Sequence, residues 1–429
     1  MRSTRDRLCQ DARSMRGKDI LISGSGIAGL VLAWWLGRYG FRPTIVEKST
    51  GLRRGGHAVD LWGTALDVLE WMGLLAELEE RRTRNDRGVM ITPGLRPREI
   101  ELNRISGQFA SKQIEIMRGE LVGILGRSLS AGGDFMFGNS ISGMDEHAGG
   151  VNVTFESGDS RDFELVIGAD GQHSNVRHIA FGEEDRFSRN LGGYVCGYTV
   201  ADDHKLGEGV HRYVVPNKTV VVFPIRHSGD AAVIFLFRPT RPLGLQHDDV
   251  KGQIKALQTT FGGESWEVAH LLDRLTGAKD FYFESLDQIT MQSWHRARIA
   301  LVGDAAYCPA PAVGGGTSLA VIGAYTLARE LAEAKGDYRW ALQSYHNATR
   351  DLVHQSRVIG PALFESLVPS SRISIYLGML LLPLVTRLPG ALRRNVPLLP
   401  RRAVRAMRAV SEAPVRHGGL PESHESLSI

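Results

Sequence analysis

The chain has 429 residues, of which 43% are hydrophobic, enough to bury a large core and form two or more domains. Its cysteines, Cys9, Cys196 and Cys308, are too few and too widely spaced for a disulfide framework or a metal site, and they fit a reducing cytoplasm. The net charge of +4 arises at the ends, because residues 372–416 carry +8 and residues 1–18 carry +4, which leaves −8 for the rest. The net negative charge of these remaining residues argues against nucleic-acid binding.

The first apolar run, residues 20–22, predicts a strand that leads through a glycine-rich turn into a helix over residues 30–36. This order is the context that a dinucleotide-binding fingerprint requires, because glycines let the backbone approach a pyrophosphate at the helix N-terminus. A second strand, residues 44–46, ends where a carboxylate can accept ribose hydroxyls. The residues predicted to bind the cofactor in this segment are Gly24, Gly26, Ile27, Ala28, Gly29, Glu47 and Lys48.

Two later motifs have the same form as each other. Asp170 follows the apolar run 165–167, and Asp304 follows the run 299–302, in each case directly after a glycine-containing turn. The carboxyl ends of parallel strands form the ligand edge of an α/β sheet. The three motifs together therefore predict one FAD site, whereas the first motif alone would not distinguish FAD from NAD.

With these motifs the chain resembles the class A flavin-dependent aromatic hydroxylases, the para-hydroxybenzoate hydroxylase type, over residues 18–350. Within that group it is most similar to the tetracycline-inactivating and polyketide-tailoring branch, through residues 55–60, 115–121 and 300–325. The resemblance implies an α/β (α+β) fold. In that fold a Rossmann-like FAD-binding domain contains an inserted antiparallel β-sheet domain for the substrate, and a helical region follows at the C-terminus.

The resemblance also implies roles for individual residues. Asp304 would bind the FAD ribitol, Arg118 the diphosphate side, and Asp170 both FAD and NAD(P)H. A glycine-rich turn before a predicted helix would direct backbone N–H groups toward the flavin, although Gly315 and Ser318 depart from the family's Gly-Gln-Gly and Asn. The remaining residues implied in cofactor binding are Arg54, Gly56, Gly303, Gly314, Gly315, Gly316 and Thr317.

The predicted domains are discontinuous. Residues 18–80, 114–185 and 290–345 are assigned to the FAD-binding domain, with helical spacing over 61–78 and a hairpin over 149–164. Residues 81–113 and 186–289 are assigned to the substrate domain, where runs of Val, Phe and Tyr predict strands at 194–200, 210–215, 219–225 and 231–238. Residues 346–416 are assigned to a C-terminal helical region, and residues 1–17 and 417–429 to disordered tails.

The predicted substrate contacts are His57, Arg212, Tyr213, Phe223 and Pro311. Arg212 and Tyr213 are neighbours on one strand and face opposite ways, so at most one of them points into a pocket. The alternating apolar residues 221, 223 and 225 favour a polycyclic aromatic ligand, since a small benzoate would need a buried cation. No catalytic residue and no metal ligand is assigned.

The resemblance implies a monooxygenase that uses NADPH or NADH and O₂, through a flavin C4a-hydroperoxide, to hydroxylate a polyketide-like small molecule. Baeyer–Villiger oxidation of a polycyclic ketone, and a non-oxygenating FAD reductase or sensor, remain alternatives. The protein is expected to be a cytoplasmic monomer or homodimer. The apolar run 373–385 is expected to pack on the core as a helix; interfacial membrane attachment is the alternative, since about 20 residues are needed to span a bilayer.

Overall fold

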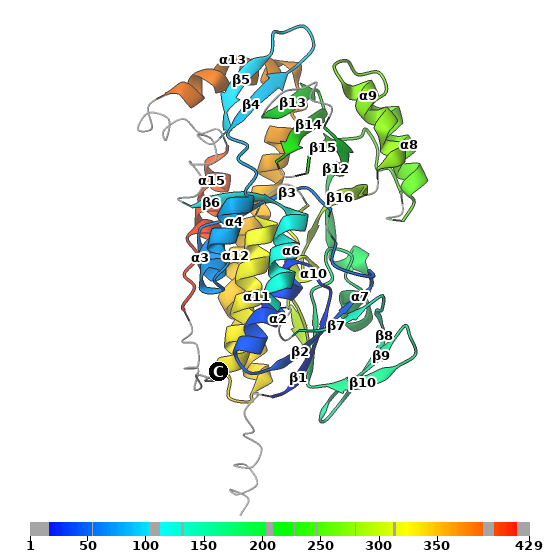
Figure 1. Ribbon diagram of the computed structural model, residues 1–429, viewed down its shortest axis with the longest axis vertical. Coiled ribbons are helices and arrows are strands. Elements are labelled where there is room, and N and C mark those ends of the chain that lie inside the picture. Colours follow the sequence, from blue (N-terminus) through cyan, green and yellow to red (C-terminus); the bar gives the residue numbers. More distant parts are fainter. Residues whose placement is uncertain are drawn as a thin grey trace, which may run out of the picture.

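The computed structural model describes residues 17–53, 55–102, 112–129, 133–202, 209–226, 228–245, 248–278, 280–311, 315–388 and 399–417. Arg54, Gly314 and most of the two predicted tails lie outside these ranges. Figure 1 shows an elongated molecule, with a six-stranded sheet and its helices in the lower part and a seven-stranded sheet in the upper part. The predicted α/β fold with an added substrate-side sheet and C-terminal helices is confirmed.

The lower sheet is Rossmann-like. Its strands lie in the order β17, β18, β11, β1, β2, β7, and every adjacent pair is parallel except β17 with β18. The strand order reverses at β1, which is where open α/β sheets bind ligands at the carboxyl ends of their strands. The bounds are β1 Asp19–Ser23, β2 Arg42–Glu47, β7 Asp134–Phe137, β11 Leu165–Gly168, β17 His295–Arg296 and β18 Ile299–Leu301.

Two apolar helices, α2 (Ile27–Arg38) and α11 (Gly316–Glu333), pack on each other beside this sheet. Fourteen of the 18 residues of α11 are buried, so this helix is a central element of the core. The long helix α12 (Tyr338–Leu367) runs along α11 and reaches the seven-stranded sheet, where Phe364 packs with Val195. Further helices are α6 Arg118–Leu129, α7 Asn175–Phe181, α10 Asp304–Tyr307, and the short 3₁₀ turns η1 Glu184–Arg186 and η2 Arg274–Gly277.

The helix predicted over residues 61–78 is wrong in part. Its beginning belongs to strand β3 (Ala58–Trp62), which pairs antiparallel with β6 (Gln113–Met117) in a two-stranded ribbon. The rest forms two helices, α3 (Thr64–Trp71) and α4 (Leu75–Arg81). Gly73 separates them with a φ of 78°, a conformation that a helix cannot contain. Hydrophobic spacing alone does not reveal such a break.

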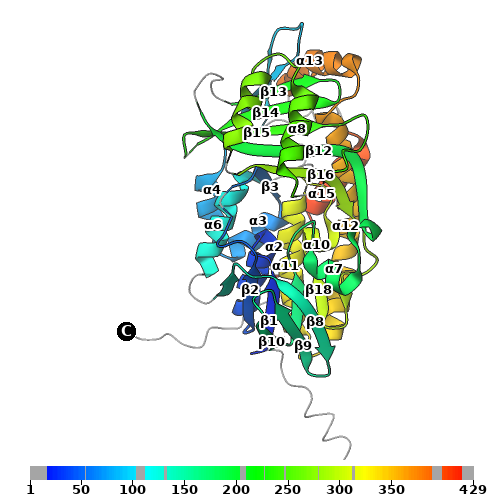
Figure 2. The ribbon, with the colours of Figure 1, turned by 90° about the vertical axis from the view of Figure 1, so that its right-hand side faces the viewer.

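The upper sheet has the strand order β16, β12, β15, β14, β13, β4, β5. Its pairs are antiparallel except β4 with β13, because β4 joins from the earlier segment of the chain and not through a hairpin. One face packs on α8 (Val250–Phe261) and α9 (Val268–Asp273), helices that were not predicted; Figure 2 shows α8 across this sheet. The strands are β4 Arg87–Ile91, β5 Arg98–Glu101, β12 Ser188–Ala201, β13 Val210–Val215, β14 Lys218–Ile225, β15 Asp230–Phe237 and β16 Tyr282–Ile289.

A small antiparallel sheet, β8 (Ile141–His147), β9 (Gly150–Phe155) and β10 (Ser160–Phe163), contains the predicted hairpin. The strands of the six-stranded sheet and of this small sheet come from the segments predicted to bind FAD. Those of the seven-stranded sheet come from the segments predicted to bind substrate. The domain boundaries themselves stay a prediction.

The C-terminal region ends in α13 (Arg372–Arg387) and α15 (Arg401–Ser411). Residues 373–385 are helical as expected, but the helix packs on the protein through one narrow face, with only Ile375, Met379 and Thr386 buried. In the part of the chain that the structure describes, no single helix is long and apolar enough to cross a membrane. Helices α12 and α13 together, with a bend of 92° between them, are long and apolar enough, but only length and composition support such a span.

Candidate active site

The first glycine motif has the geometry of a dinucleotide-binding turn. A Cβ on Gly24, whose φ is 104°, would lie 2.6 Å from the carbonyl oxygen of Ala169, and one on Gly29 would lie 2.0 Å from that of Gly24. A Cβ on Gly26 would instead meet nothing nearer than an Arg118 guanidinium nitrogen at 3.9 Å. The first and third glycines therefore permit close packing, while the second leaves space before the N-terminus of α2.

The three motifs meet at the carboxyl edge of the six-stranded sheet. The N–H of Ala169, in the second motif, donates to the carbonyl oxygen of Ser23 at 2.8 Å, directly before the first motif. A Cβ on Gly303, in the third motif, would lie 2.9 Å from the Cβ of Ala28. Ile27 and Ala28 form the buried first turn of α2, so this turn lies between the other two motifs.

A buried arginine that the sequence analysis missed joins the second motif to the third. Arg177, on α7, donates to the carbonyl oxygens of Gln172 at 2.6 Å and Ala305 at 2.9 Å, and it pairs with Glu184 at 2.6 Å. Its side chain is 1% exposed. Breaking these bonds would leave a charge in the interior, so Arg177 holds the two turns in a defined relative position.

Glu47 ends β2 beside the first motif. One of its carboxylate oxygens accepts the N–H and the hydroxyl of Ser25, both at 2.9 Å, and the other accepts the N–H of Ser49 at 2.9 Å. Burial alone would raise the pKa of Glu47, but the hydrogen bonds from Ser25 and Ser49 outweigh it and hold the pKa below its ordinary value. Glu47 is therefore an ionised acceptor next to the turn, and Lys48 follows it with an exposed side chain.

Arg118 begins α6 and lies across the turn from Glu47. Its N–H donates to the carbonyl oxygen of His57 at 3.0 Å, and its side chain would contact a Cβ on Gly56 at 3.3 Å. Burial lowers the pKa of Arg118, as does the neighbouring charge of Arg53, while Asp304 and Glu47 oppose the shift. Arg118 thus supplies positive charge beside the open space at the second glycine. Arg54 lies outside the described residues.

Asp304 begins α10 at the same edge of the sheet. Burial raises its pKa, and the positive charge of Arg118 opposes this rise. One of its carboxylate oxygens lies 3.6 Å from where a Cβ on Gly316 would stand, at the start of α11. Cys308, which follows α10, is 1% exposed, and burial raises its pKa well above the ordinary value. Its thiol therefore stays protonated and is a poor nucleophile.

The N-terminus of α11 lies against the β3–β6 ribbon. Gly315 has a φ of 79°, and a Cβ there would stand 3.2 Å from the Trp62 ring. The hydroxyl of Ser318, which departs from the family's Asn, accepts the N–H of Trp62 at 2.9 Å and so fixes the helix to β3. Gly316 and the partly exposed Thr317 form the first turn. Gly314 lies outside the described residues.

Asp170 bonds mainly to its own segment, and it also accepts the hydroxyl of Ser23, at the end of β1, at 3.4 Å. One carboxylate oxygen accepts the hydroxyl of Ser174 at 2.5 Å, and the other accepts the N–H of Val176 at 3.0 Å. Ser174 in turn caps α7 by accepting the N–H of Arg177 at 3.0 Å. Through these contacts Asp170 stabilises the turn before α7. Its role toward FAD or NAD(P)H remains a prediction.

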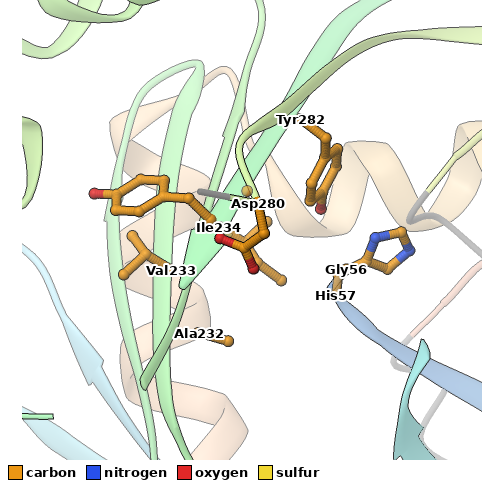
Figure 3. Close-up of a pocket in the computed structure, with 9 residues that line it drawn as sticks. Gly56, His57, Ala232, Val233, Ile234, Asp280 and Tyr282 are labelled. Carbon is orange, nitrogen blue, oxygen red and sulfur yellow. The ribbon is translucent and has the colours of Figure 1, made fainter. Parts of the chain in front are cut away.

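A pocket lies between the glycine loop after β2 and the seven-stranded sheet. Its cavity volume is about 10 Å³, and its lining comes from Gly56, His57, Gly197, Tyr198, Ala232, Val233, Ile234, Asp280 and Tyr282. Figure 3 shows the rings of His57 and Tyr282 on the same side of the pocket, with centroids 5.3 Å apart. Burial, and then the charge of Arg118, lower the pKa of His57 to about 4, so its imidazole is neutral near pH 7.

Arg212 and Tyr213 face opposite sides of the upper sheet, as predicted. Tyr213 is 1% exposed and points away from the pocket, where it bonds to Glu264 at 3.0 Å. The prediction that Tyr213 contacts the substrate is wrong, because its side chain belongs to the core under α8 and α9. Arg212 donates to the carbonyl oxygens of Ser366 and Leu367 at the end of α12, at 2.9 and 2.7 Å. Burial lowers its pKa to about 10, which leaves it charged.

Phe223 and Pro311 take different positions. Phe223 is 4% exposed and packs with Met117 and Ala232, so it joins the upper sheet to the β3–β6 ribbon. Pro311 is partly exposed and ends the described stretch that follows α10. Neither residue lines the pocket around His57.

Tyr282, at the start of β16, was not predicted from the sequence as a site residue. Its hydroxyl is buried and has no hydrogen-bond partner among the described residues, and burial raises its pKa well above the ordinary value. A Cβ at Gly197 would lie 2.3 Å from the Tyr282 ring. A glycine opposite a tyrosine in neighbouring strands was the only sequence signal, and it could not be recognised without the strand register.

A half-buried carboxyl pair lies in the β3–β6 ribbon, and the sequence did not reveal it. Asp60 accepts the side-chain amide of Gln113 at 2.7 Å, while Glu115 accepts from Thr83 at 2.5 Å and from Asn85 at 2.7 Å. Burial, and then the charge of Glu115, raise the pKa of Asp60 to about 7. The ribbon beneath the start of α11 thus contains a carboxyl group that is harder to ionise than an ordinary aspartate.

The residues at this edge fit an extended dinucleotide. The space at Gly26 can admit a pyrophosphate at the N-terminus of α2, with Arg118 beside it. Glu47 and Asp304 stand as two separate carboxylate acceptors, and the first turn of α11 offers backbone N–H groups. No group of three or more potential metal ligands occurs among the described residues.

Comparisons with known proteins show the family to which the chain belongs. Residues 18–357 match the family model described as FAD binding domain. An uncharacterized protein of Mycobacterium tuberculosis is 38% identical over 342 residues, which cover 79% of this chain and 92% of that protein. A flavin-dependent monooxygenase of Legionella longbeachae is 34% identical over 355 residues, which cover 83% of this chain and 91% of that protein.

The solved structure of tetracycline destructase Tet(51) has a similar fold along its whole length. The TM-score is 0.79 and the sequence identity 29%, and the match covers 94% of this chain and 100% of that one. The C-terminal helices therefore belong to the shared architecture and are not an addition to it.

Proposed function

Because the chain belongs to the FAD-binding domain family of flavin-dependent monooxygenases, we propose that it uses NAD(P)H and O₂ to insert one oxygen atom into a polycyclic aromatic, polyketide-like small molecule. The observation that carries this proposal is the convergence of three motifs, with Gly24 against Ala169 and Ala28 against Gly303, at an edge near which the upper sheet and the glycine loop enclose a pocket. A cofactor groove beside a substrate wall is the arrangement that oxygen transfer requires.

FAD is the proposed cofactor, and its contacts follow the geometry of the edge. The turn at Gly24, Gly26 and Gly29 would receive the pyrophosphate together with Arg118. Glu47 would bind the adenosine ribose and Asp304 the ribitol, while the first turn of α11 would face the ring. When bound, FAD supplies the transfer of two electrons from NAD(P)H and the activation of O₂. The sequence has no second glycine fingerprint, which supports transient docking of NAD(P)H.

The chain's own contribution is to hold the substrate and exclude water. His57 is neutral near pH 7 because burial and Arg118 lower its pKa to about 4, so it can exchange a hydrogen bond but supplies no charge. The Tyr282 hydroxyl is a second polar group in the same pocket and is unpaired among the described residues. These two side chains are proposed to orient a phenolic or keto oxygen of the substrate.

The pocket wall favours an apolar polycyclic substrate over a small carboxylate. A benzoate would require a buried cation on the upper sheet, and the candidate there, Arg212, already binds the carbonyl oxygens at the end of α12. Polycyclic ligands gain affinity from buried apolar area at about 25 cal/mol per Å². The structural similarity to tetracycline destructase Tet(51) supports the same class of substrate, a polycyclic compound.

Such a substrate needs more space than the present pocket offers. Ligand pockets usually measure about 300–1,000 Å³, whereas the cavity volume here is about 10 Å³, the space of about one water molecule. The loop that carries Gly55 packs closely on the upper sheet, since a Cβ there would lie 2.7 Å from that of Asp280. Movement of this loop away from Asp280 is proposed to enlarge the pocket when substrate and flavin are bound.

The test is to measure NAD(P)H oxidation and O₂ uptake by the FAD-loaded protein, with mass spectrometry of the products. The expected balance is one NAD(P)H, one proton and one O₂ consumed for each oxygen inserted and each water released. NAD(P)H oxidation should be slow without a substrate. It should rise several-fold with a tricyclic or tetracyclic phenol, but not with simple hydroxybenzoates. The product should gain one oxygen atom, labelled when ¹⁸O₂ is supplied.

Three outcomes would contradict the proposal in different ways. NAD(P)H oxidation that responds to substrate without any oxygenated product indicates a reductase. A response to a monocyclic benzoate but to no polycycle shows that the substrate class is wrong. A lactone or ester formed from a polycyclic ketone indicates Baeyer–Villiger chemistry on the same scaffold.

A further inference from the structure

Helix α13 has two apolar stripes on opposite sides, and among the described residues only one of them packs on other elements. Ile375 and Met379 are 4% and 2% exposed, and they pack with residues of β4, β5 and β13. The second stripe consists of Ile373, Tyr376, Leu377, Leu380, Leu381 and Leu384, which are 45–72% exposed. We propose that this second stripe is an interfacial anchor that lies on a membrane surface containing anionic lipids.

The spacing of the exposed stripe is that of an amphipathic helix. Its six residues stand at positions i, i+3, i+4, i+7, i+8 and i+11 from Ile373, which at about 100° per residue places them within an arc of roughly 140°. The buried residues Ile375 and Met379 fall on the other side of the helix. Scattered exposed hydrophobic residues need no explanation, but a continuous stripe of six marks an interaction site.

Charge indicates what the stripe contacts. Between Glu365 and Glu412 the sequence contains eight arginines and no Asp, Glu or Lys. Arg372 and Arg387 are exposed at the two ends of α13, and four more arginines are exposed on α15. Figure 1 shows α13 at the upper end of the molecule, away from the six-stranded sheet. An apolar stripe flanked by arginines matches the acyl boundary and the headgroups of an anionic bilayer.

Two other arrangements fit less well. A second copy of the chain would place the same surface against itself about a twofold axis, so that arginines would face arginines with no acidic residue in this segment to offset them. A spanning helix is excluded by length, because 16 residues extend about 24 Å, less than the hydrocarbon thickness of about 30 Å. Since one side of α13 packs on the upper sheet, the helix can lie on a bilayer but not cross it.

The proposal is tested by co-sedimentation of the full-length, FAD-loaded protein with two kinds of vesicle, phosphatidylcholine alone and phosphatidylcholine mixed with phosphatidylglycerol. Binding to the anionic vesicles should be at least about tenfold stronger and should weaken as salt is raised. The double variant L377D/L384D should lose at least about tenfold in this binding. The double variant R372Q/R387Q should reduce only the preference for anionic vesicles.

A matched control replaces two exposed hydrophobic residues elsewhere, Val250 and Trp340, which are 47% and 51% exposed, by Asp; it should bind vesicles as the wild type does. All variants should keep their FAD content and melting temperature, since the replaced side chains are exposed. Absence of binding to anionic vesicles, or equal binding to both kinds, overturns the proposal. A dimer seen by light scattering that L377D/L384D dissociates, without vesicle binding by the wild type, assigns the stripe to a second copy.

Discussion

The two walls around the candidate site are built from different parts of the polypeptide. The wall on the six-stranded sheet is mostly backbone, made of turns in which Gly24 and Gly29 leave no room for a Cβ. The wall on the seven-stranded sheet is mostly side chains, chief among them Tyr282 and Ile234. A backbone wall can bind the invariant part of a ligand, such as a phosphate, while a side-chain wall can change its shape without change of fold.

The difference also determines what each wall tolerates. An added methyl group at Gly29 would collide with the backbone of Gly24, which can move aside only if helix α2 shifts, whereas the tyrosine at position 282 could become phenylalanine without any new contact. We therefore expect changes to the first wall to reduce folding and FAD content, and changes to the second wall to alter substrate response with FAD retained. Four predictions test this contrast.

The largest effect is expected for Gly29→Ala. Its Cβ would stand 2.0 Å from the carbonyl oxygen of Gly24, so helix α2 must shift away from the turn at a cost of about 1–3 kcal/mol or more in unfolding free energy. The melting temperature should fall and FAD should be lost. Gly26→Ala is the control: with its nearest neighbour at 3.9 Å, it should keep the melting temperature and lose only FAD affinity. Equal melting temperatures for the two variants would contradict this account.

Asp304→Ala should weaken FAD binding by about ten- to a hundredfold, because a hydrogen bond to a charged group contributes about 1.5–3 kcal/mol. The stability of the flavin-free protein should not fall, since burial raises the pKa of Asp304 and its ionised form is already unfavourable there. Titration of the apoprotein with FAD, followed by fluorescence, measures the first effect. Unchanged affinity would remove Asp304 from the cofactor site.

Tyr282→Phe tests the side-chain wall. Removing a buried hydroxyl that is unpaired among the described residues should raise the unfolding free energy of the flavin-free protein by about 1 kcal/mol. FAD affinity should not change, while the substrate-stimulated rate of NAD(P)H oxidation should fall several-fold. If neither the melting temperature nor the stimulated rate changes, the hydroxyl has no part in the pocket.

The smallest effect concerns a contact between the two walls. His173, two residues after the second motif, bonds to Glu184 at 2.8 Å and to Glu284 of β16 at 2.9 Å, and these carboxylates raise its pKa to about 10. The protonated form therefore stabilises the folded state fully below about pH 6.5, and this contribution is lost as the pH rises toward 10. Because these side chains are about one-third exposed, His173→Gln should cost only about 1 kcal/mol.

Melting curves of the wild type and His173→Gln across this pH range measure the effect. The difference between the two proteins should be largest near pH 6.5 and should shrink toward pH 10. A difference independent of pH would mean that His173 contributes packing and not charge.

The fold and the cofactor wall could be predicted from the sequence to a large extent. Glycine turns after apolar strands have few alternatives, because only glycine permits both the positive φ of Gly24 and the close approach at Gly29. Ser318 could be recognised as a departure from the family pattern, but not as the residue that fixes α11 to Trp62. That contact joins residues 256 positions apart, and no local pattern encodes it.

The substrate wall was harder to predict, and the reason is strand register. Alternation on β13 correctly indicated that Arg212 and Tyr213 face opposite ways, but not that both are already bound to the protein, one to the end of α12 and the other to Glu264. Tyr282 became visible as a wall residue only when β16 was paired with β12 opposite Gly197. A shift of one residue in that pairing would turn the tyrosine to the other face.

The sequence by itself determined the βαβ turn, the carboxylate that ends strand β2 and the one that follows strand β18, and the apolar character of residues 373–385, because these properties depend on neighbouring residues in the chain. The tertiary structure alone decided which side chains face the crevice and which apolar surfaces stay exposed. Helices α2 and α13 illustrate this, since both are apolar, yet nine residues of α2 are buried and only three of α13. Burial depends on what packs against a helix, and that is a property of the whole fold.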